Sequence, residues 1–336
     1  MFLKLEEKGV KISGIGYYLP ETILSNDDVI AQSGLPLNSD WIKKRIGSDK
    51  RHKIADDEYT SDLAIKAAKR ALENSNTSPD EIEMIILSTI SPDNPNPSTA
   101  CAVQAGLGMS KLTCPCFDIS AACSGFIYAL DIGVKNILTG AKKVLVIAAE
   151  VRSRFVNKKD PSTFAIFGDG AAAVVLESAN KNEGILAIET LADGSGYFSV
   201  HIPAGGTRKP ASEETIKNNE HFIKMENGEK IFFEVVEGMT KYSKLFLDKC
   251  NLNLDEINFF VPHQANLNII KEVARRVNIP FEKIITNFSE VGNTSSASIP
   301  IAIAQALENG KIKKGDLLLL SAVGAGHTMG ISLIRI

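Results

Sequence analysis

Apolar and polar residues follow one another along the chain in two kinds of pattern. Residues 61–74 carry apolar side chains at helical spacing behind a Ser-Asp start, which predicts an amphipathic helix. Residues 82–90, 142–150 and 316–324 are short runs that are apolar throughout, which is typical of buried strands. Helices placed between buried strands indicate an α/β fold in layers around central sheets.

A weak internal repeat divides this pattern in two. Residues 78–90 resemble residues 253–265, and Asp-Glu-Ile recurs in both. Each copy is followed by a segment rich in Gly, Ala and Ser that leads into a predicted helix, at 119–130 and 292–307. The repeat predicts a duplicated domain, with halves at 1–178 and 179–336. The alternative is a chance similarity between two short α/β stretches.

Composition and charge narrow the class of protein. The 336 residues are 44% hydrophobic and carry a formal charge of -3, which argues against a nucleic-acid binder. The first residues lack the apolar core of a signal peptide, and no run approaches a membrane span, so we expect a cytoplasmic protein without a membrane partner. The chain has five cysteines, and Cys114-Pro-Cys116 has neither a second pair nor nearby histidines, so no metal site is expected.

Cys123 lies in AACSGF, where a predicted strand (114–120) meets a predicted helix (124–138). The positive end of a helix dipole favours a thiolate, and the free N–H groups there can hold an oxyanion. The small neighbours leave room for a substrate. These features predict a nucleophile, and the alternative is a small cysteine buried in strand–helix packing.

Two further residues lie at similar turns. His263 follows the apolar run 259–262, at the strand edge where α/β sheets bind ligands; it could instead be a surface or capping residue. Asn293 lies in GNTSSASIP, whose position in the repeat mirrors that of Cys123, although turn or N-cap roles are common for asparagine. Gly324–Gly326 form a third turn, in which backbone amides can approach a ligand closely.

Seven motifs in order resemble the β-ketoacyl synthase III branch of the thiolase-like superfamily: GIGYYLPE, WIKKRIGSDKRH, DISAACSGF, FGDGAAAVVL, VPHQAN, GNTSSASIP and GAGHTMG. The resemblance covers nearly the whole chain. It implies a five-layered, duplicated αβαβα fold, a homodimer, and a catalytic triad of Cys123, His263 and Asn293.

The resemblance also implies a reaction. Cys123 takes an acyl group from an acyl-CoA, and backbone N–H groups of Cys123 and Ala325 hold the oxyanion. Malonyl-acyl carrier protein or malonyl-CoA then loses carbon dioxide, while His263 and Asn293 donate hydrogen bonds to the enolate. Coenzyme A thioesters enter as substrates, and no resident cofactor is implied.

Binding residues follow from the same resemblance. Trp41 and Arg45 match residues that bind the nucleotide end of coenzyme A, and Asn266 would line the pantetheine tunnel. The chain departs from the family's usual pattern in several places. Pro161 and Asn268 stand where arginines are common, Asn96 where a phenylalanine often closes the acyl pocket, and Val323 and His327 alter the wall near the triad. Arg275 and Arg276 remain candidates for docking a carrier protein.

These departures leave the acyl group and the pathway open, whether fatty-acid initiation or a specialised route. A decarboxylating condensing enzyme is the first hypothesis. The second is an acyltransferase that moves the acyl group from Cys123 to an amine, a hydroxyl or another non-malonyl nucleophile. A non-catalytic acyl-binding scaffold is the third.

Overall fold

The computed structural model describes residues 1–6, 8–109 and 114–336. Its strands are β1 (Phe2–Lys4), β2 (Gly9–Tyr18), β3 (Thr22–Ser25), β4 (Lys50–Lys53), β5 (Met84–Ser88), β6 (Cys116–Ile119), β7 (Lys143–Glu150), β8 (Gly170–Ala179), β9 (Gly184–Ala192), β10 (Val200–His201), β11 (Lys224–Met225), β12 (Phe259–Pro262), β13 (Leu317–Gly324) and β14 (Thr328–Arg335). Its helices are α1 (Asn26–Ser33), α2 (Ser39–Ile46), α3 (Thr60–Asn74), α4 (Thr99–Gly106), α5 (Gly125–Leu138), α6 (Glu213–Lys217), α7 (Gly228–Cys250), α8 (Leu267–Val277), α9 (Phe288–Val291) and α10 (Ser298–Glu308).

The main strands follow the order β12-β13-β14-β9-β2-β8-β7-β5-β6, with β1 beside β9. At the middle of this order, β2 and β9 are joined through one residue pair, Val10 and Ile185. That narrow junction separates two similar parts, β6-β5-β7-β8-β2 and β12-β13-β14-β9-β1. In both parts the outer strands pair in parallel and the inner strands antiparallel.

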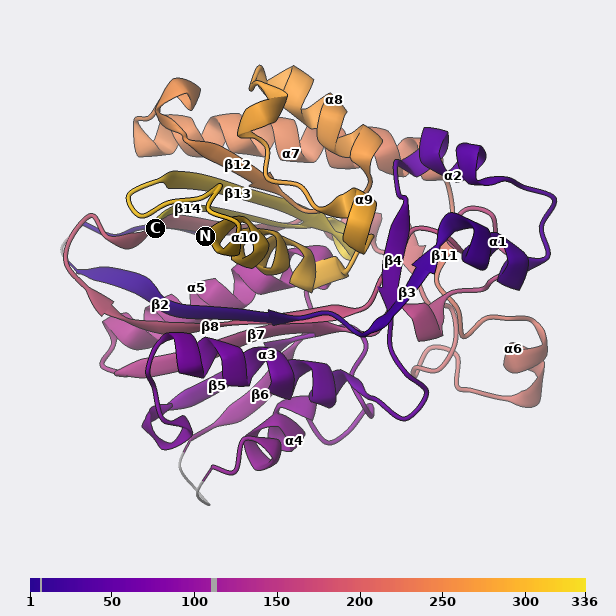
Figure 1. Cartoon of the computed structure of the whole chain (residues 1–336), viewed down its shortest axis with the longest axis horizontal. Coiled ribbons are helices and arrows are strands. Elements are labelled where there is room, and N and C mark those ends of the chain that lie inside the picture. The colour runs from indigo at the N-terminus through magenta and orange to yellow at the C-terminus, as the bar shows by residue number, and fades with distance from the viewer. Residues whose placement is uncertain (7, 110–113) are drawn as a thin grey trace.

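Helices complete five layers (Figure 1). The central helices are α5, which packs on β7, β8, β9 and β14, and α10, which packs on β2, β8 and β12. Helices α3 and α4 cover the outer face of the first part, and α7 and α8 cover that of the second. The predicted αβαβα arrangement is confirmed.

The predicted elements appear close to their expected positions. Helix α3 begins one residue earlier than its pattern indicated, and it buries Leu63, Ala64, Ala67 and Ala71 completely against the sheet. Each fully buried leucine contributes about 1.5–3 kcal/mol to stability. Strand β5 is shorter than the run 82–90, and β6 is shorter than 114–120. The residues of the runs 82–90 and 114–120 that lie outside these two strands belong to the connections beside them.

The repeat also has a structural counterpart, because β5 and β12 are each preceded by a short 3₁₀ turn, Pro79–Glu81 and Leu254–Glu256. The proposed boundary at 178/179 stays a prediction. It falls at the end of β8, and β1 from the chain's start pairs with β9 of the second half. Within the described residues, every helix is too short or too polar to cross a bilayer.

Candidate active site

Cys123 lies in a sharp turn between β6 and α5. The turn is a 3₁₀ segment, η2 (Ala122–Ser124), in which Ala122 has a left-handed backbone with φ of +46°. The Ser124 hydroxyl lies 2.8 Å from both the Ala121 carbonyl and the Thr328 hydroxyl. Because Thr328 begins β14, this contact fastens the turn to the other half of the molecule.

The environment of the Cys123 thiol differs from the sequence-based expectation. Burial raises its pKa to about 11, with Glu150 adding to the rise and Ser295 and Arg152 opposing it. The expectation of a thiolate favoured by the helix dipole was therefore wrong for the resting protein, because loss of water outweighs the dipole. The Ser295 hydroxyl donates to the thiol sulfur at 3.8 Å. Ser295 belongs to the 3₁₀ turn η7 (Ser295–Ala297), two residues after Asn293.

His263 directly follows β12 and is 2% exposed. Its backbone N–H donates to the Ser321 carbonyl at 2.8 Å, and its Nδ1 lies 2.7 Å from the Ser298 hydroxyl oxygen. Burial lowers the pKa of His263 to about 3. The imidazole is therefore neutral at pH 7, so it can donate a hydrogen bond without carrying a charge.

Asn293 is 6% exposed, and neighbouring backbone groups fix its side chain. Its Oδ1 accepts the Ser295 N–H at 2.8 Å, and its Nδ2 donates to the Ala265 carbonyl at 3.3 Å. Ala265 is two residues beyond His263, so the NH₂ end of the amide faces the histidine turn. The second N–H of Nδ2 stays available for a substrate oxygen.

Direct contacts thus link the three turns that the sequence singled out. Ser295 joins the Asn293 turn to Cys123, and Ser298, at the start of α10, joins the same segment to His263. No role for Ser295 or Ser298 was predicted from the sequence, although both lie in the conspicuous run Thr-Ser-Ser-Ala-Ser.

The glycine turn after β13 lies against Cys123. A Cβ atom on Gly324 would come within 2.8 Å of the Cys123 backbone nitrogen, so only glycine fits there without displacement. The next residue, Ala325, begins the 3₁₀ turn η8 (Ala325–His327). This places the two predicted oxyanion-hole residues on adjoining stretches of backbone.

A buried carboxylate beneath the site, that of Glu150, was also missed. Glu150, fully buried at the end of β7, accepts from the Ser91 and Ser296 hydroxyls at 2.8 Å each. Burial raises the pKa of Glu150, while the nearby Arg152 guanidinium opposes that rise. The signal was a lone carboxylate ending an otherwise apolar strand. Since Ser296 neighbours Ser295, this network supports the turn that contacts Cys123.

Two predicted coenzyme A residues lie together on α2. The Arg45 guanidinium carbon is 5.2 Å from the centre of the Trp41 ring, and that ring lies 6.4 Å from Phe164. Asn266 caps α8 by accepting the Ile269 N–H at 2.8 Å, a structural role that leaves its NH₂ group for other partners. The Asn268 side chain donates to the Arg45 carbonyl at 2.8 Å, which fastens α2 to α8.

The remaining candidates lie at the surface. Arg275 and Arg276 both pair with Glu272, at 2.7 Å, and Arg276 also pairs with Glu237 at 3.4 Å, so their charges are partly neutralised. Asn96 is exposed in the connection between β5 and α4.

Two of the cysteines outside the site lie close to each other. The Cys101 and Cys116 sulfur atoms lie 3.6 Å apart. Among residues 1–6, 8–109 and 114–336, no three histidine, cysteine, aspartate or glutamate side chains gather in a way that could hold a metal ion.

The duplicated αβαβα fold, with cysteine, histidine and asparagine on facing turns, is that of thiolase-like enzymes that transfer acyl groups. Comparison with known proteins narrows this class. The sequence model of the protein family 3-oxoacyl-[acyl-carrier-protein (ACP)] synthase III matches residues 117–194. The family model for the C-terminal part of that synthase matches residues 247–336. The chain belongs to the 3-oxoacyl-[acyl-carrier-protein] synthase III family.

Individual relatives agree over nearly the full length. A β-ketoacyl-[acyl-carrier-protein] synthase III from Clostridioides difficile is 43% identical, covering 96% of this chain and 97% of the relative. The corresponding protein of Fusobacterium nucleatum is 40% identical, covering 98% and 99%. The crystal structure of the Aquifex aeolicus synthase III superposes with a TM-score of 0.88 at 41% identity, covering 98% of this chain and all of that one.

Proposed function

We propose that this chain is a condensing enzyme that joins an acyl group from an acyl-CoA to the two-carbon unit of a malonyl thioester. The malonyl carrier is acyl carrier protein or coenzyme A, and the product is a β-ketoacyl thioester. One observation carries the proposal: a single segment, 293–298, contacts both Cys123 and His263 and contains Asn293. The names of the relatives support the same reaction.

In the first half-reaction the Cys123 sulfur attacks the thioester carbonyl of the acyl-CoA. The carbonyl oxygen becomes an oxyanion, which the backbone N–H groups of Cys123 and Ala325 stabilise. The coenzyme A thiolate then leaves and takes up the proton that the Cys123 thiol gives up. Because the site is neutral before and after this exchange, a thiol pKa of about 11 is compatible with it. The thiolate forms only as the substrate arrives.

In the second half-reaction the malonyl thioester loses carbon dioxide, and negative charge builds up on its thioester oxygen. His263 and Asn293 donate hydrogen bonds to that oxygen from Nε2 and Nδ2. The Ser298 oxygen already accepts the Gln264 N–H at 3.3 Å, so its own O–H can point to His263 Nδ1, leaving the hydrogen on Nε2. The resulting carbanion attacks the acyl carbon on Cys123 and releases the thiolate, which takes up a proton.

A neutral donor pair suits this step for an electrostatic reason. An imidazolium at the site would attract the malonyl carboxylate and stabilise the ground state as well as the transition state. With its pKa near 3, His263 stays uncharged at physiological pH. Its hydrogen bond therefore strengthens chiefly as the enolate forms.

The proposal also covers how coenzyme A, a second copy of the chain and the carrier protein bind. Trp41 and Arg45 hold the nucleotide end of coenzyme A, which is a substrate, and the Asn266 NH₂ group lines the path of the pantetheine arm. Two copies form a dimer in the cytoplasm, with Asn96 of one copy near the acyl pocket of the other. Arg275 and Arg276 face an acidic carrier protein.

A two-stage assay tests the reaction. The protein is first acylated with acetyl-CoA and then given malonyl-carrier protein or malonyl-CoA. Release of carbon dioxide with a β-keto product supports condensation. Loss of the adduct to an amine or hydroxyl acceptor, without carbon dioxide, would instead establish the plain acyltransferase. A His263→Ala variant should still be acylated but should lose decarboxylation, and loss of acylation alone would contradict the assigned roles.

A further inference from the structure

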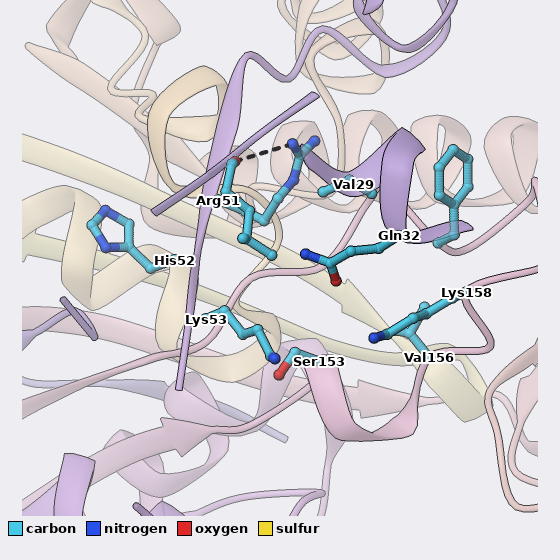
Figure 2. A pocket seen from close by; sticks show the side chains of 10 residues that line it. Val29, Gln32, Arg51, His52, Lys53, Ser153, Val156 and Lys158 are labelled. Carbon is cyan, nitrogen blue, oxygen red and sulfur yellow. Dashed lines mark hydrogen bonds between the residues drawn. The ribbon is translucent and has the colours of Figure 1, made fainter. Parts of the chain in front are cut away.

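A solvent-open recess lies beside α1, bordered by β3, β4 and the segment that follows β7 (Figure 2). Its cavity volume is about 50 Å³, and it is lined by Leu24, Val29, Gln32, Arg51, His52, Lys53, Ser153, Val156, Lys158 and Phe164. A second recess of about 500 Å³ shares Gln32, Lys53, Ser153, Val156 and Lys158 with it. The two recesses therefore form one continuous groove.

Three lysines line the groove. Lys53 and Lys158 line both recesses, and Lys159 lines the second. Within the described part of the chain none of the three forms an ion pair, in contrast to Lys50 on the same strand as Lys53, which lies 2.6 Å from Glu290. Figure 2 shows the Lys53 and Lys158 side chains directed into the same open space. A cleft lined by one sign of charge concentrates ions of the opposite sign.

Arg154 adds to this charge from a fixed position. One nitrogen of its guanidinium donates to the carbonyls of Ala55, Asp56 and Glu58 at 2.8–3.0 Å, and the group lies over the Tyr59 ring. Asp56 is the one carboxylate among the residues that line the groove. The net charge of the lining is therefore positive, as an anionic ligand requires.

The groove adjoins the proposed nucleotide site. Phe164 forms part of its wall and also faces the Trp41 ring at 6.4 Å. The C-terminal end of α2 contacts α8, because a Cβ on Gly47 would meet the Leu267 side chain and the Asn268 side chain donates to the Arg45 carbonyl at 2.8 Å. Pantetheine is proposed to run past Asn266, which directly precedes α8. An adenosine at Trp41 would thus lie next to the proposed pantetheine path and, through Phe164, next to the lysine groove.

We propose that this groove binds the ribose 3′-phosphate of the coenzyme A donor, through Lys53 and Lys158. The inference rests on the proposed function, because it takes a coenzyme A thioester as the substrate. The 3′-phosphate is the dianionic group that projects from adenosine away from the pantetheine arm. Pro161 stands where the resemblance makes an arginine common, and Lys53 and Lys158 supply positive charge that Pro161 cannot.

Calorimetric titration tests the assignment without relying on catalysis. Coenzyme A, 3′-dephospho-coenzyme A, pantetheine and inorganic phosphate are titrated into the wild type and into a Lys53→Gln/Lys158→Gln variant. Each exposed lysine–phosphate contact strengthens binding by up to about fivefold. The double variant should therefore bind coenzyme A about tenfold more weakly and pantetheine as the wild type does. Wild type should also prefer coenzyme A to its dephospho form, and the variant should lose that preference.

A matched variant, Lys181→Gln, removes an exposed lysine from the turn between β8 and β9, at the opposite end of β2 from the groove. It should leave all four titrations unchanged. The assignment is overturned if the double variant keeps the wild-type preference for coenzyme A over its dephospho form. Binding of inorganic phosphate as tight as that of coenzyme A would also overturn it, since the site would then serve a free anion. Failure of acetyl-pantetheine and acetyl-CoA alike to acylate the wild type would instead count against the proposed function.

Discussion

Replacement of Ser298 by alanine separates the two half-reactions. The hydroxyl of Ser298 lies 2.7 Å from His263 Nδ1 and accepts the Gln264 N–H at 3.3 Å, and all three residues are at most 2% exposed. Alanine would leave Nδ1 without its partner. The imidazole could then carry its proton on either nitrogen, and the tautomer with the hydrogen on Nε2 would lose its advantage.

The expected magnitude follows from this one lost hydrogen bond. A neutral buried hydrogen bond contributes about 0.5–1.5 kcal/mol, and a buried group left unpaired costs about 1–3 kcal/mol. If that free energy is lost in the decarboxylating transition state, condensation slows by about 10- to 100-fold. Acylation of Cys123 does not use the His263 hydrogen bond and should change by less than about threefold.

Rapid-quench mass measurement gives the acylation rate, and release of labelled carbon dioxide from malonyl thioester gives the condensation rate. Ser332→Ala is the matched control, because Ser332 is fully buried and its hydroxyl bonds to the Ala187 carbonyl at 3.1 Å. It should alter neither rate. Equal losses of both rates in Ser298→Ala would refute the reasoning, as would a wild-type condensation rate.

Three further predictions concern the same site. The depressed pKa of His263 means that the unfolded chain binds a proton between about pH 6.5 and pH 3 that the folded chain does not, so the free energy of unfolding falls as pH falls through this window. The slope is up to about 1.4 kcal/mol per pH unit in urea unfolding, and it should flatten in His263→Asn; equal slopes would contradict the assignment. Gly324→Ala should slow acylation at least about tenfold, because its Cβ would meet the Cys123 nitrogen at 2.8 Å, while Gly206→Ala, with open space around it, should not. Glu150→Ala should destabilise the fold by about 1–3 kcal/mol in thermal or urea unfolding, since it leaves the buried Ser91 and Ser296 hydroxyls without this acceptor, and an unchanged free energy of unfolding would show that these hydrogen bonds are not held as described.

Much of the fold could be predicted because its signals are local or periodic. Apolar runs mark β7 and β13, helical spacing marks α3, and the repeat of 78–90 at 253–265 indicates the duplication. The turns that carry Cys123, His263 and Asn293 could be located because small residues stand between strand and helix patterns. The order of the strands in the sheet was not predicted, since pairing such as that of Val10 with Ile185 joins residues far apart in the sequence.

Other features of the site depend on contacts between distant segments. Nothing near Cys123 in sequence shows that Ser295 lies 3.8 Å from its sulfur, or that burial raises its thiol pKa. Local reasoning saw only the helix dipole and so predicted the opposite shift. Arg276 similarly meets Glu237 only in the fold, at 3.4 Å, because the two residues lie on α8 and α7.

The Cys123 sulfur is expected to carry the acyl group. Incubation with a panel of acyl-CoAs, followed by intact-mass and peptide mass measurement, tests it directly. A mass increase equal to one acyl group is expected, located on the peptide that contains Cys123 and absent from Cys123→Ala. An acyl adduct that persists in Cys123→Ala, or no adduct from any acyl-CoA in the panel, would contradict it.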